Sequence, residues 1–288
     1  MTTAAFLGLG VMGAPMAGYL AGAGFDVAVY NRTQAKAEAW AQSHKGRAAA
    51  DPADAVRDAD LVLMCLGDDP DVAAIVEAIA PSLKAGAVLA DHTTASPALA
   101  RRLAEALGAK GVGFVDAPVS GGQAGAENGT LSIMCGGADA DVATIRPAME
   151  TYSARITHVG PAGAGQLCKA VNQICIAGLV QGLAEGLHFA SQAGLDVEKT
   201  LEAVSGGAAQ SWQMDNRAKT MAADEFEFGF AVDWMRKDLR IALAEARENG
   251  ARLPVTALVD QFYADVQSMG GGRWDTSSLL RRLEGSKK

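Results

Sequence analysis

Histidine and cysteine are scarce in this chain of 288 residues, with four of each, and neither type clusters at the spacing of metal ligands. No Cys-x-x-Cys pair is present, so the sequence predicts no metal site. Cys65, Cys135, Cys168 and Cys175 all fall in apolar segments. We therefore expect reduced, buried thiols in a cytoplasmic protein.

Runs of basic residues are also missing. The 25 lysines and arginines are outnumbered by 33 acidic residues, for a formal net charge of −8. This balance argues against nucleic acid or an acidic membrane as a partner. The longest apolar stretch, residues 174–184, is interrupted by Gln181 and is too short to span a bilayer. The N-terminal segment lacks a basic leader and does not look like a signal peptide.

Glycine, in contrast, is abundant, and three glycines near the N-terminus form a pattern. An apolar run at residues 3–9 leads into Gly8-x-Gly10-x-x-Gly13, and a helical stretch at 14–23 follows. Gly8 would allow the tight turn, Gly10 the close approach of a pyrophosphate, and Gly13 the packing of helix on strand. A second strand at 25–30 completes the unit. The turn predicted to bind a dinucleotide comprises Gly8, Leu9, Gly10, Val11, Met12 and Gly13. The alternative is a packing turn without a ligand.

The end of that second strand indicates which dinucleotide is preferred. An acidic residue usually stands there and binds the ribose hydroxyls of NAD, but this chain has Asn31, Arg32 and Thr33. Arg32 would attract a 2′-phosphate, to which Asn31 and Thr33 can donate hydrogen bonds. We therefore expect NADP rather than NAD. The alternative is that Arg32 is a solvated surface cation and that Asn31 caps the next helix.

Strand and helix patterns alternate through the first half of the chain and then stop. Alternation of this kind predicts a mostly parallel, doubly wound sheet, that is, an α/β Rossmann-type domain over residues 1–162. Residues 163–288 show only helical patterns and are predicted to form an all-helical substrate and oligomerisation domain. It begins with a long interdomain helix at about 165–193, apolar nearly all round and therefore expected to be buried. Residues 285–288 are predicted to be disordered.

Two further segments carry polar groups suited to chemistry. Ser120, Gly121 and Gly122 follow a strand, and they offer a hydroxyl and backbone N–H groups that a carboxylate can approach without a Cβ in the way. An ordinary glycine-rich loop is the alternative. Lys169 and Asn172 lie three residues apart, on one face of the long helix. A desolvated lysine there can exchange protons near neutral pH, unless its side chain reaches out to solvent.

Four segments together resemble the β-hydroxyacid dehydrogenase family, which includes 3-hydroxyisobutyrate dehydrogenase and the glyoxylate/succinic semialdehyde reductases. FLGLGVMGAPMA resembles the family's cofactor signature and DAPVSGGQAGAENGTL its substrate loop. GAGQLCKAVNQ resembles its catalytic helix, and FAVDWMRKDL its C-terminal motif. The resemblance extends over essentially the whole chain. With the NADP preference expected above, it implies an NADP-dependent oxidoreductase that interconverts a small carboxylated aldehyde (a semialdehyde) and its hydroxyacid. The apolar helical domain and its long helix lead us to expect a homodimer or homotetramer.

The resemblance also implies roles for matching positions. Lys169 matches the catalytic lysine that donates a proton to the carbonyl oxygen. The implied substrate-binding residues are Ser120, Gly121, Gly122, Asn172, Phe230 and Asp238, and the further cofactor-contacting residues are Leu66, Gly67, Thr94 and Lys237. The family often has a second asparagine directly after the first. Gln173 stands there in this chain, which leaves the shape of that subsite open.

Two other functions remain possible on the sequence alone. Imine reductases share the implied architecture but replace the catalytic lysine, so Lys169 argues against that activity. A non-catalytic scaffold with the dehydrogenase fold would lose the lysine, whereas this chain retains both the lysine and the cofactor glycines.

Overall fold

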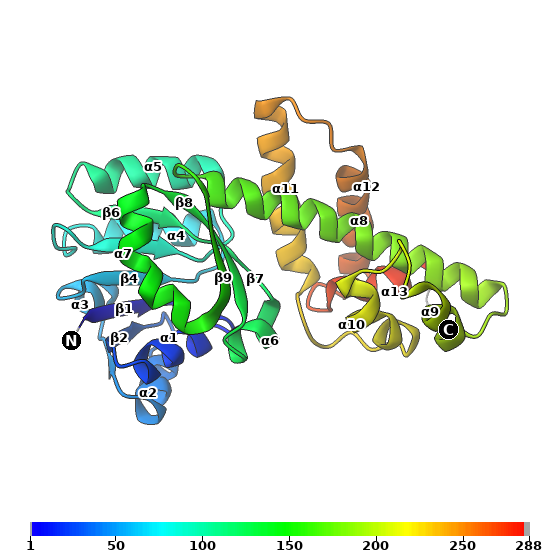
Figure 1. Cartoon of the computed structure of the whole chain (residues 1–288), viewed down its shortest axis with the longest axis horizontal. Coiled ribbons are helices and arrows are strands. Elements are labelled where there is room, and N and C mark those ends of the chain that lie inside the picture. Colours follow the sequence, from blue (N-terminus) through cyan, green and yellow to red (C-terminus); the bar gives the residue numbers. More distant parts are fainter. Residues whose placement is uncertain (1, 285–288) are drawn as a thin grey trace. The chain divides into compact units, whose positions relative to one another are not determined.

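The protein is described by a computed structural model that covers residues 2–284. The predicted disorder of residues 285–288 lies outside this range. Contacts group the chain into two compact units, Met1–Lys169 and Ala170–Lys288. The division falls inside α8 (Ala164–Gln192), the long green helix of Figure 1.

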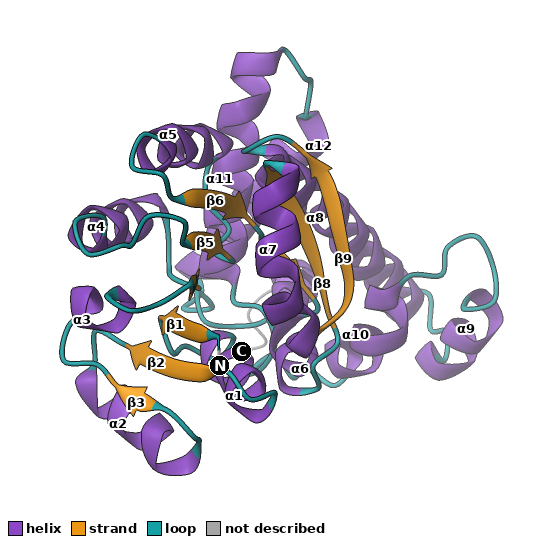
Figure 2. Cartoon of the chain, turned by 60° about the vertical axis from the view of Figure 1, so that its left-hand side comes forward, coloured by secondary structure: helices purple, strands orange, loops and turns teal. Residues whose placement is uncertain are grey.

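The first unit is built on a nine-stranded sheet. Its order is β3-β2-β1-β4-β5-β6-β8-β7, and β9 pairs with β8. Strands β1 to β6 run parallel to one another, and Figure 2 draws the strands in orange. They span β1 (Thr3–Leu7), β2 (Asp26–Tyr30), β3 (Arg47–Ala48), β4 (Leu61–Met64), β5 (Val88–Asp91) and β6 (Gly113–Asp116). The chain leaves β1 in one direction for β2 and later returns to its other side as β4. Ligands of such sheets bind at this switch point, outside the carboxyl ends of the strands.

The last three strands turn the sheet partly antiparallel. β8 (Leu131–Gly137) runs against both β6 and β7 (Val119–Ser120), while β9 (Ser153–Gly160) is parallel to β8. This arrangement brings the loop after β6 back along the sheet, so that Ser120 pairs with Ser132.

Helices cover both faces of the sheet because its strand residues alternate between two hydrophobic cores. Ala4 and Phe6 of β1 enter one core and Ala5 and Leu7 the other. The first core includes α1 (Gly13–Gly22), α2 (Gln34–Ser43) and α7 (Asp139–Met149). The second includes α3 (Pro52–Val56), α4 (Asp69–Ile79) and α5 (Pro97–Gly108).

The N-termini of α3, α4 and α5 are determined by capping residues in the sequence. Asp51 caps α3 and Ser96 caps α5, and each is followed by a proline in the first turn. Asp68 and Asp71 form a capping box at the start of α4. These caps fix where the chain leaves the sheet edge and enters each helix.

The second unit is helical, as expected. It contains the rest of α8, α9 (Val197–Val204), α10 (Trp212–Ala222), α11 (Val232–Asn249), α12 (Pro254–Ser268), a 3₁₀ turn η2 (Thr276–Ser278) and α13 (Leu279–Glu284). One apolar core joins them, with contributions from Ala177, Met221, Leu239 and Tyr263. Buried Asp275 joins α10, the segment before α11 and η2, since its carboxylate accepts hydrogen bonds from Arg217, the Phe230 N–H and Ser277.

The predicted fold class is confirmed, but several details differ. The short strands β3 and β7 and the helix α6 (Gly122–Glu127) were not expected, because two to six residues give too little periodicity to detect. Cys175 is exposed rather than buried. The prediction that α8 is buried all round is also wrong, since Val171, Leu179 and Phe189 are 60%, 47% and 72% exposed in the single chain.

Within residues 2–284, α8 is long and apolar enough to cross a membrane by length and composition alone. Core helices of globular enzymes pass the same test. Its buried stripe begins with Gln166, Lys169 and Gln173, which are costly in hydrocarbon.

A buried histidine links three parts of the first unit. His92 directly follows β5, and its Nδ1 lies 2.7 Å from the carbonyl oxygen of Ala117. Its Nε2 lies 2.8 Å from the hydroxyl of Tyr152, which is fully buried. Burial lowers the pKa of His92 to about 4, so the ring is neutral. A neutral ring satisfies both contacts when Nδ1–H donates to Ala117 and Nε2 accepts from Tyr152.

This histidine makes the fold sensitive to acid. The unfolded chain binds a proton at His92 below pH 6.5, whereas the folded protein resists protonation down to about pH 4. The contribution of His92 to the free energy of unfolding is therefore present above pH 6.5 and is lost as the pH falls towards 4, by about 2 kcal/mol between pH 7 and pH 5.

We expect the free energy of unfolding of His92→Asn, measured in urea, to fall less than that of the wild type between pH 7 and pH 5. The titration of carboxylates is common to both proteins and cancels in this comparison. Parallel curves for the wild type and His92→Asn would contradict this assignment.

Candidate active site

The glycine turn after β1 has the geometry that its sequence predicts. A Cβ on Gly13 would collide with the Gly8 carbonyl oxygen and Phe6, and one on Gly8 with the Cys65 carbonyl oxygen. Gly8 also has a φ of +96°. A Cβ on Gly10 would meet no atom within 4 Å. The fold therefore explains two glycines, and the third faces open space, as close approach of a pyrophosphate requires.

The end of β2 lies against this turn. The Leu9 N–H donates to Asn31 Oδ1 over 2.9 Å, and Asn31 Nδ2 donates to the Thr33 carbonyl oxygen. Asn31 thus links the end of β2 to the glycine turn. One of the two Nδ2 hydrogens of Asn31 is already hydrogen-bonded within the protein. Thr33, not Asn31, stands at the N-cap of α2, although its side chain makes no capping bond. Arg32 has a side chain that is 91% exposed and lies 3.6 Å from Asp71.

Hydrogen bonds to side chains hold the segments after β4 and β5 together. The Leu66 N–H donates to Thr93 Oγ1 over 2.8 Å, which holds Leu66 and Gly67 beside the loop that carries Thr94. The side chain of Gln166 secures the same loop, because its Nε2 donates to the Thr93 carbonyl and its Oε1 accepts from the Ala95 N–H. The predicted cofactor contacts of the first unit therefore share the carboxyl edge of the sheet.

Asp116 fixes the start of α8 to the end of β6. Its carboxylate is fully buried and accepts the N–H groups of Gly163 and Gln166 over 2.7 and 2.9 Å. Burial raises the pKa of Asp116 to about 6, although these N–H groups act in the opposite direction. A Cβ on Gly165 would strike backbone oxygens of Met134 and Asp116, so only glycine lets the helix approach the sheet this closely.

Ser120 ends β7, Gly122 begins α6, and Gly121 lies between them. The two glycines differ from what we expected. A Cβ on Gly121 would lie 3.1 Å from the side chain of Leu131, and the φ of Gly121 is +131°. Glycine is therefore required at this position for packing and for the backbone conformation. A Cβ on Gly122 would meet nothing within 4 Å, so Gly122 is the position open to a ligand.

Lys169 and Asn172 lie on α8, about one turn apart. Lys169 is 7% exposed, so its side chain does not reach out to solvent. Gln173, one turn beyond Lys169, is more deeply buried, at 2%.

The remaining predicted residues lie on the second unit. Gln173 Nε2 donates to Asp238 Oδ2 over 2.6 Å, and Asn172 Nδ2 donates to Gln173 Oε1 over 2.8 Å. Lys237 Nζ lies 3.0 Å from Asp238 Oδ1, as an ion pair that lacks the alignment of a hydrogen bond. Phe230 packs against the apolar core of this unit, while its N–H is held by Asp275.

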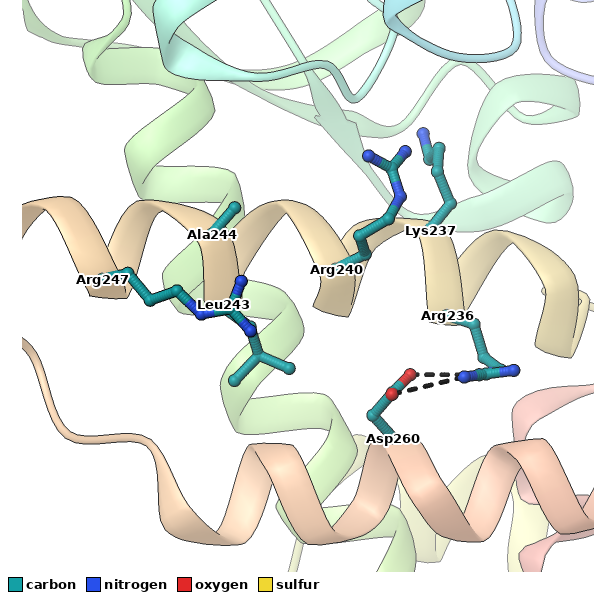
Figure 3. A pocket seen from close by; sticks show the side chains of 7 residues that line it. All are labelled: Arg236, Lys237, Arg240, Leu243, Ala244, Arg247 and Asp260. Carbon is teal, nitrogen blue, oxygen red and sulfur yellow. Dashed lines mark hydrogen bonds and ion pairs between the residues drawn. The ribbon is translucent and has the colours of Figure 1, made fainter.

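Lys237 also borders a basic groove of about 430 Å³ along α11 (Figure 3). Arg236 is neutralised there by Asp260 on α12, at 3.1 Å. Lys237 and Arg240 point to the other side of α11, away from α12. Lys237 is the one predicted site residue in this groove. In the described part of the chain, no group of three histidine, cysteine or acidic residues could hold a metal ion.

Sequence reasoning missed several residues of this region. It did not assign roles to His92, Thr93, Asp116 or Gln166, and it did not find the partner of Gln173. A signal was present for Gln166, because it precedes Lys169 by one helical turn and is a polar residue on an apolar helix. The contacts of Asp116 and Gln173 join residues 47 and 65 positions apart, which no local pattern reveals.

Two family models together match nearly the whole chain. Residues 3–160 match the NAD binding domain of 6-phosphogluconate dehydrogenase. Residues 163–283 match the NAD-binding domain of NADP-dependent 3-hydroxyisobutyrate dehydrogenase.

Individual relatives agree with these matches. An uncharacterised oxidoreductase of Shewanella frigidimarina is 58% identical over the full length of both chains. The 2-hydroxy-3-oxopropionate reductase of Escherichia coli is 35% identical, over 97% of this chain and 98% of the relative. A solved structure of Mycobacterium tuberculosis 3-hydroxyisobutyrate dehydrogenase with L-serine is 30% identical. It superimposes with a TM-score of 0.92, over 99% of this chain and all of the other.

These matches cover both units and include the segments that carry the glycine turn, Ser120 to Gly122 and Lys169. The chain is therefore an enzyme that acts on CH–OH donors with NAD(P), and it belongs to the β-hydroxyacid dehydrogenase family as a 3-hydroxyisobutyrate dehydrogenase-like hydroxyacid dehydrogenase.

Proposed function

We propose that this enzyme uses NADPH to reduce a small carboxylated aldehyde to its hydroxyacid, and that it catalyses the reverse oxidation with NADP. One observation carries the proposal. Lys169 is buried on a helix whose first turn is anchored through Asp116 to the strand that leads to Ser120 and Gly122. A buried lysine at this position can exchange a proton with a substrate oxygen near neutral pH.

The chemistry follows from the residues of the first unit. NADPH, when bound at the glycine turn, supplies the hydride. Negative charge then develops on the carbonyl oxygen of the aldehyde, and the Lys169 ammonium stabilises this charge and donates a proton to the oxygen. In the oxidative direction the lysine, as the neutral amine, accepts the hydroxyl proton.

The carboxylate of the substrate fits the loop after β6. The Ser120 hydroxyl and the backbone N–H groups of Gly121 and Gly122 are donors, and no Cβ blocks the approach at Gly122. The Escherichia coli relative is named for a substrate that combines an aldehyde and a carboxylate, which supports this class. Asn172, Phe230 and Asp238 are proposed to complete the substrate contacts.

The cofactor preference follows from the end of β2. Asn31, Arg32 and Thr33 replace the acidic residue that would bind a free ribose diol. The exposed side chain of Arg32 can turn from Asp71 to a 2′-phosphate at little cost, because an exposed ion pair contributes little. Leu66, Gly67, Thr94 and Lys237 are proposed as further cofactor contacts.

We also propose that the enzyme is a homodimer or homotetramer and acts in the cytoplasm. The exposed Val171, Leu179 and Phe189 lie along α8, and a second copy of the chain would remove them from water. The cytoplasm keeps cysteines such as Cys175 reduced.

The role of Gly10 can be separated from that of Gly13. We expect Gly10→Ala to fold like the wild type, because its Cβ meets no protein atom. The same methyl group should weaken NADPH binding by about tenfold or more, because it occupies the approach to the pyrophosphate. Gly13→Ala should instead lower the melting temperature. Nucleotide fluorescence titration and thermal melts of both variants give the comparison. Wild-type NADPH affinity in Gly10→Ala would contradict the assignment.

Arg32 should determine the choice between the two cofactors. A charge-assisted contact with the 2′-phosphate favours NADPH by roughly ten- to a hundredfold in kcat/KM. Arg32→Ala should lose most of this preference and leave NADH use almost unchanged. Asp71→Asn, which removes the competing carboxylate, should keep or increase it. Added salt should reduce the preference of the wild type, because the site is exposed. A wild type that uses both cofactors equally well would overturn the proposal.

Lys169 should control the chemical step. Lys169→Ala is expected to lower kcat by roughly a hundred- to ten-thousandfold with carboxylated aldehydes, while NADPH still binds. Lys199→Ala, on the exposed surface of α9, is the matched control and should be fully active. A panel of small aldehydes with and without a carboxylate tests the substrate class. Near wild-type kcat in Lys169→Ala, or a preference for uncharged aldehydes, would exclude this mechanism.

A further inference from the structure

A chain of buried polar side chains connects α8 with α11 in the second unit. Asn172 donates to Gln173 over 2.8 Å, and Gln173 donates to Asp238 over 2.6 Å. The carboxylate of Asp238 in turn pairs with Lys237 at 3.0 Å. Gln173 and Asp238 are each 2% exposed, so water cannot replace these contacts.

The chemistry of the carboxylate sets the direction of every bond in this chain. A carboxylate only accepts hydrogen bonds, so Gln173 must turn its Nε2 towards Asp238. Its Oε1 then faces Asn172, which must present Nδ2. One Nδ2 hydrogen is thereby committed, and Asn172 offers its Oδ1 and one N–H to a substrate. The orientation of an amide on α8 thus depends on a charge on α11.

We propose that Gln173 is a positioning residue that orients the Asn172 amide and holds Asp238 against Lys237. This inference rests on the proposed function, in which Asn172 and Asp238 contact the substrate and Lys237 the cofactor. The side chain of Gln173 reaches α11 and donates its hydrogen bond to Asp238. In this proposal Gln173 therefore does not line a substrate subsite itself.

Gln173→Glu tests the proposal because it changes charge with little change in shape. Two carboxyl groups at hydrogen-bond distance share one proton at low pH and repel each other once both are ionised. Charged groups near position 173 include Lys169, four residues earlier on α8, and Lys237 on α11, which pairs with Asp238. The two lysines favour ionisation of the carboxyl pair and burial opposes it, and the repulsion develops once the shared proton leaves as the pH rises.

The expected result is a new pH dependence. Gln173→Glu should approach wild-type kcat near pH 6 and fall at least about tenfold below it near pH 8. Gln181→Glu is the matched control, because Gln181 donates to Glu185 over 2.6 Å on the same helix, two turns further on. It creates a similar pair of acids but should keep the wild-type pH profile of kcat. A Gln173→Glu profile that superimposes on the wild type overturns the proposal.

A measurement without turnover separates this proposal from the proposed function. If the wild type reduces no carboxylated aldehyde with NADPH, the proposed function fails, and the Asn172 amide is then followed by NMR. Gln173→Met, which has a similar length but no polar group, should shift the Asn172 side-chain amide resonances, and Gln181→Met should not. Unshifted Asn172 resonances in folded Gln173→Met would overturn the positioning role.

Discussion

The carboxylate of Asp116 is the contact on which the first unit of this enzyme depends. It lies at the end of β6 and accepts two N–H groups from the start of α8, in a site without solvent. Those N–H groups would otherwise be orphans at a helix terminus. One residue thus determines where the helix that carries Lys169 begins, relative to the loop with Ser120. Gln166 extends the same connection to the loop after β5.

Three buried titratable side chains, in both units, have specific polar partners. His92 lies between the Ala117 carbonyl and Tyr152, and Asp116 is bound by backbone N–H groups. Asp238 is balanced by Lys237 and Gln173. Polar groups satisfied in this way have one arrangement, because any other leaves a donor or acceptor unpaired in a dry site. Such rigidity is what a hydride-transfer enzyme needs around its reacting atoms.

Much of this organisation could be predicted from the sequence, since it depends on local patterns. The glycines of the first turn, the alternation of strands and helices, and the bounds of α11 and α12 are all local features. The short elements β3, β7 and α6 could not be found, because their pairing partners determine them. The different roles of Gly121 and Gly122 also depend on a distant residue, Leu131. Site residues that lie directly after predicted strands were therefore accessible, and those defined by long-range hydrogen bonds were not.

The helix α8 shows why composition alone misled. Its buried stripe begins with Gln166, Lys169 and Gln173 and continues with Ala177, Val180 and Ala184. The stripe is thus polar for its first turns and mostly apolar thereafter, with Gln181, which bonds Glu185, as a buried polar exception, while Val171 and Leu179 lie on the opposite, exposed face. Apolar residues on two faces make the helix look uniformly buried. The informative signal is the place where the buried stripe changes from polar to apolar, because buried polar groups persist only where structure or chemistry requires them. On this helix that change follows Gln173, and the residues before it are the ones proposed to act on the substrate or to position those that do.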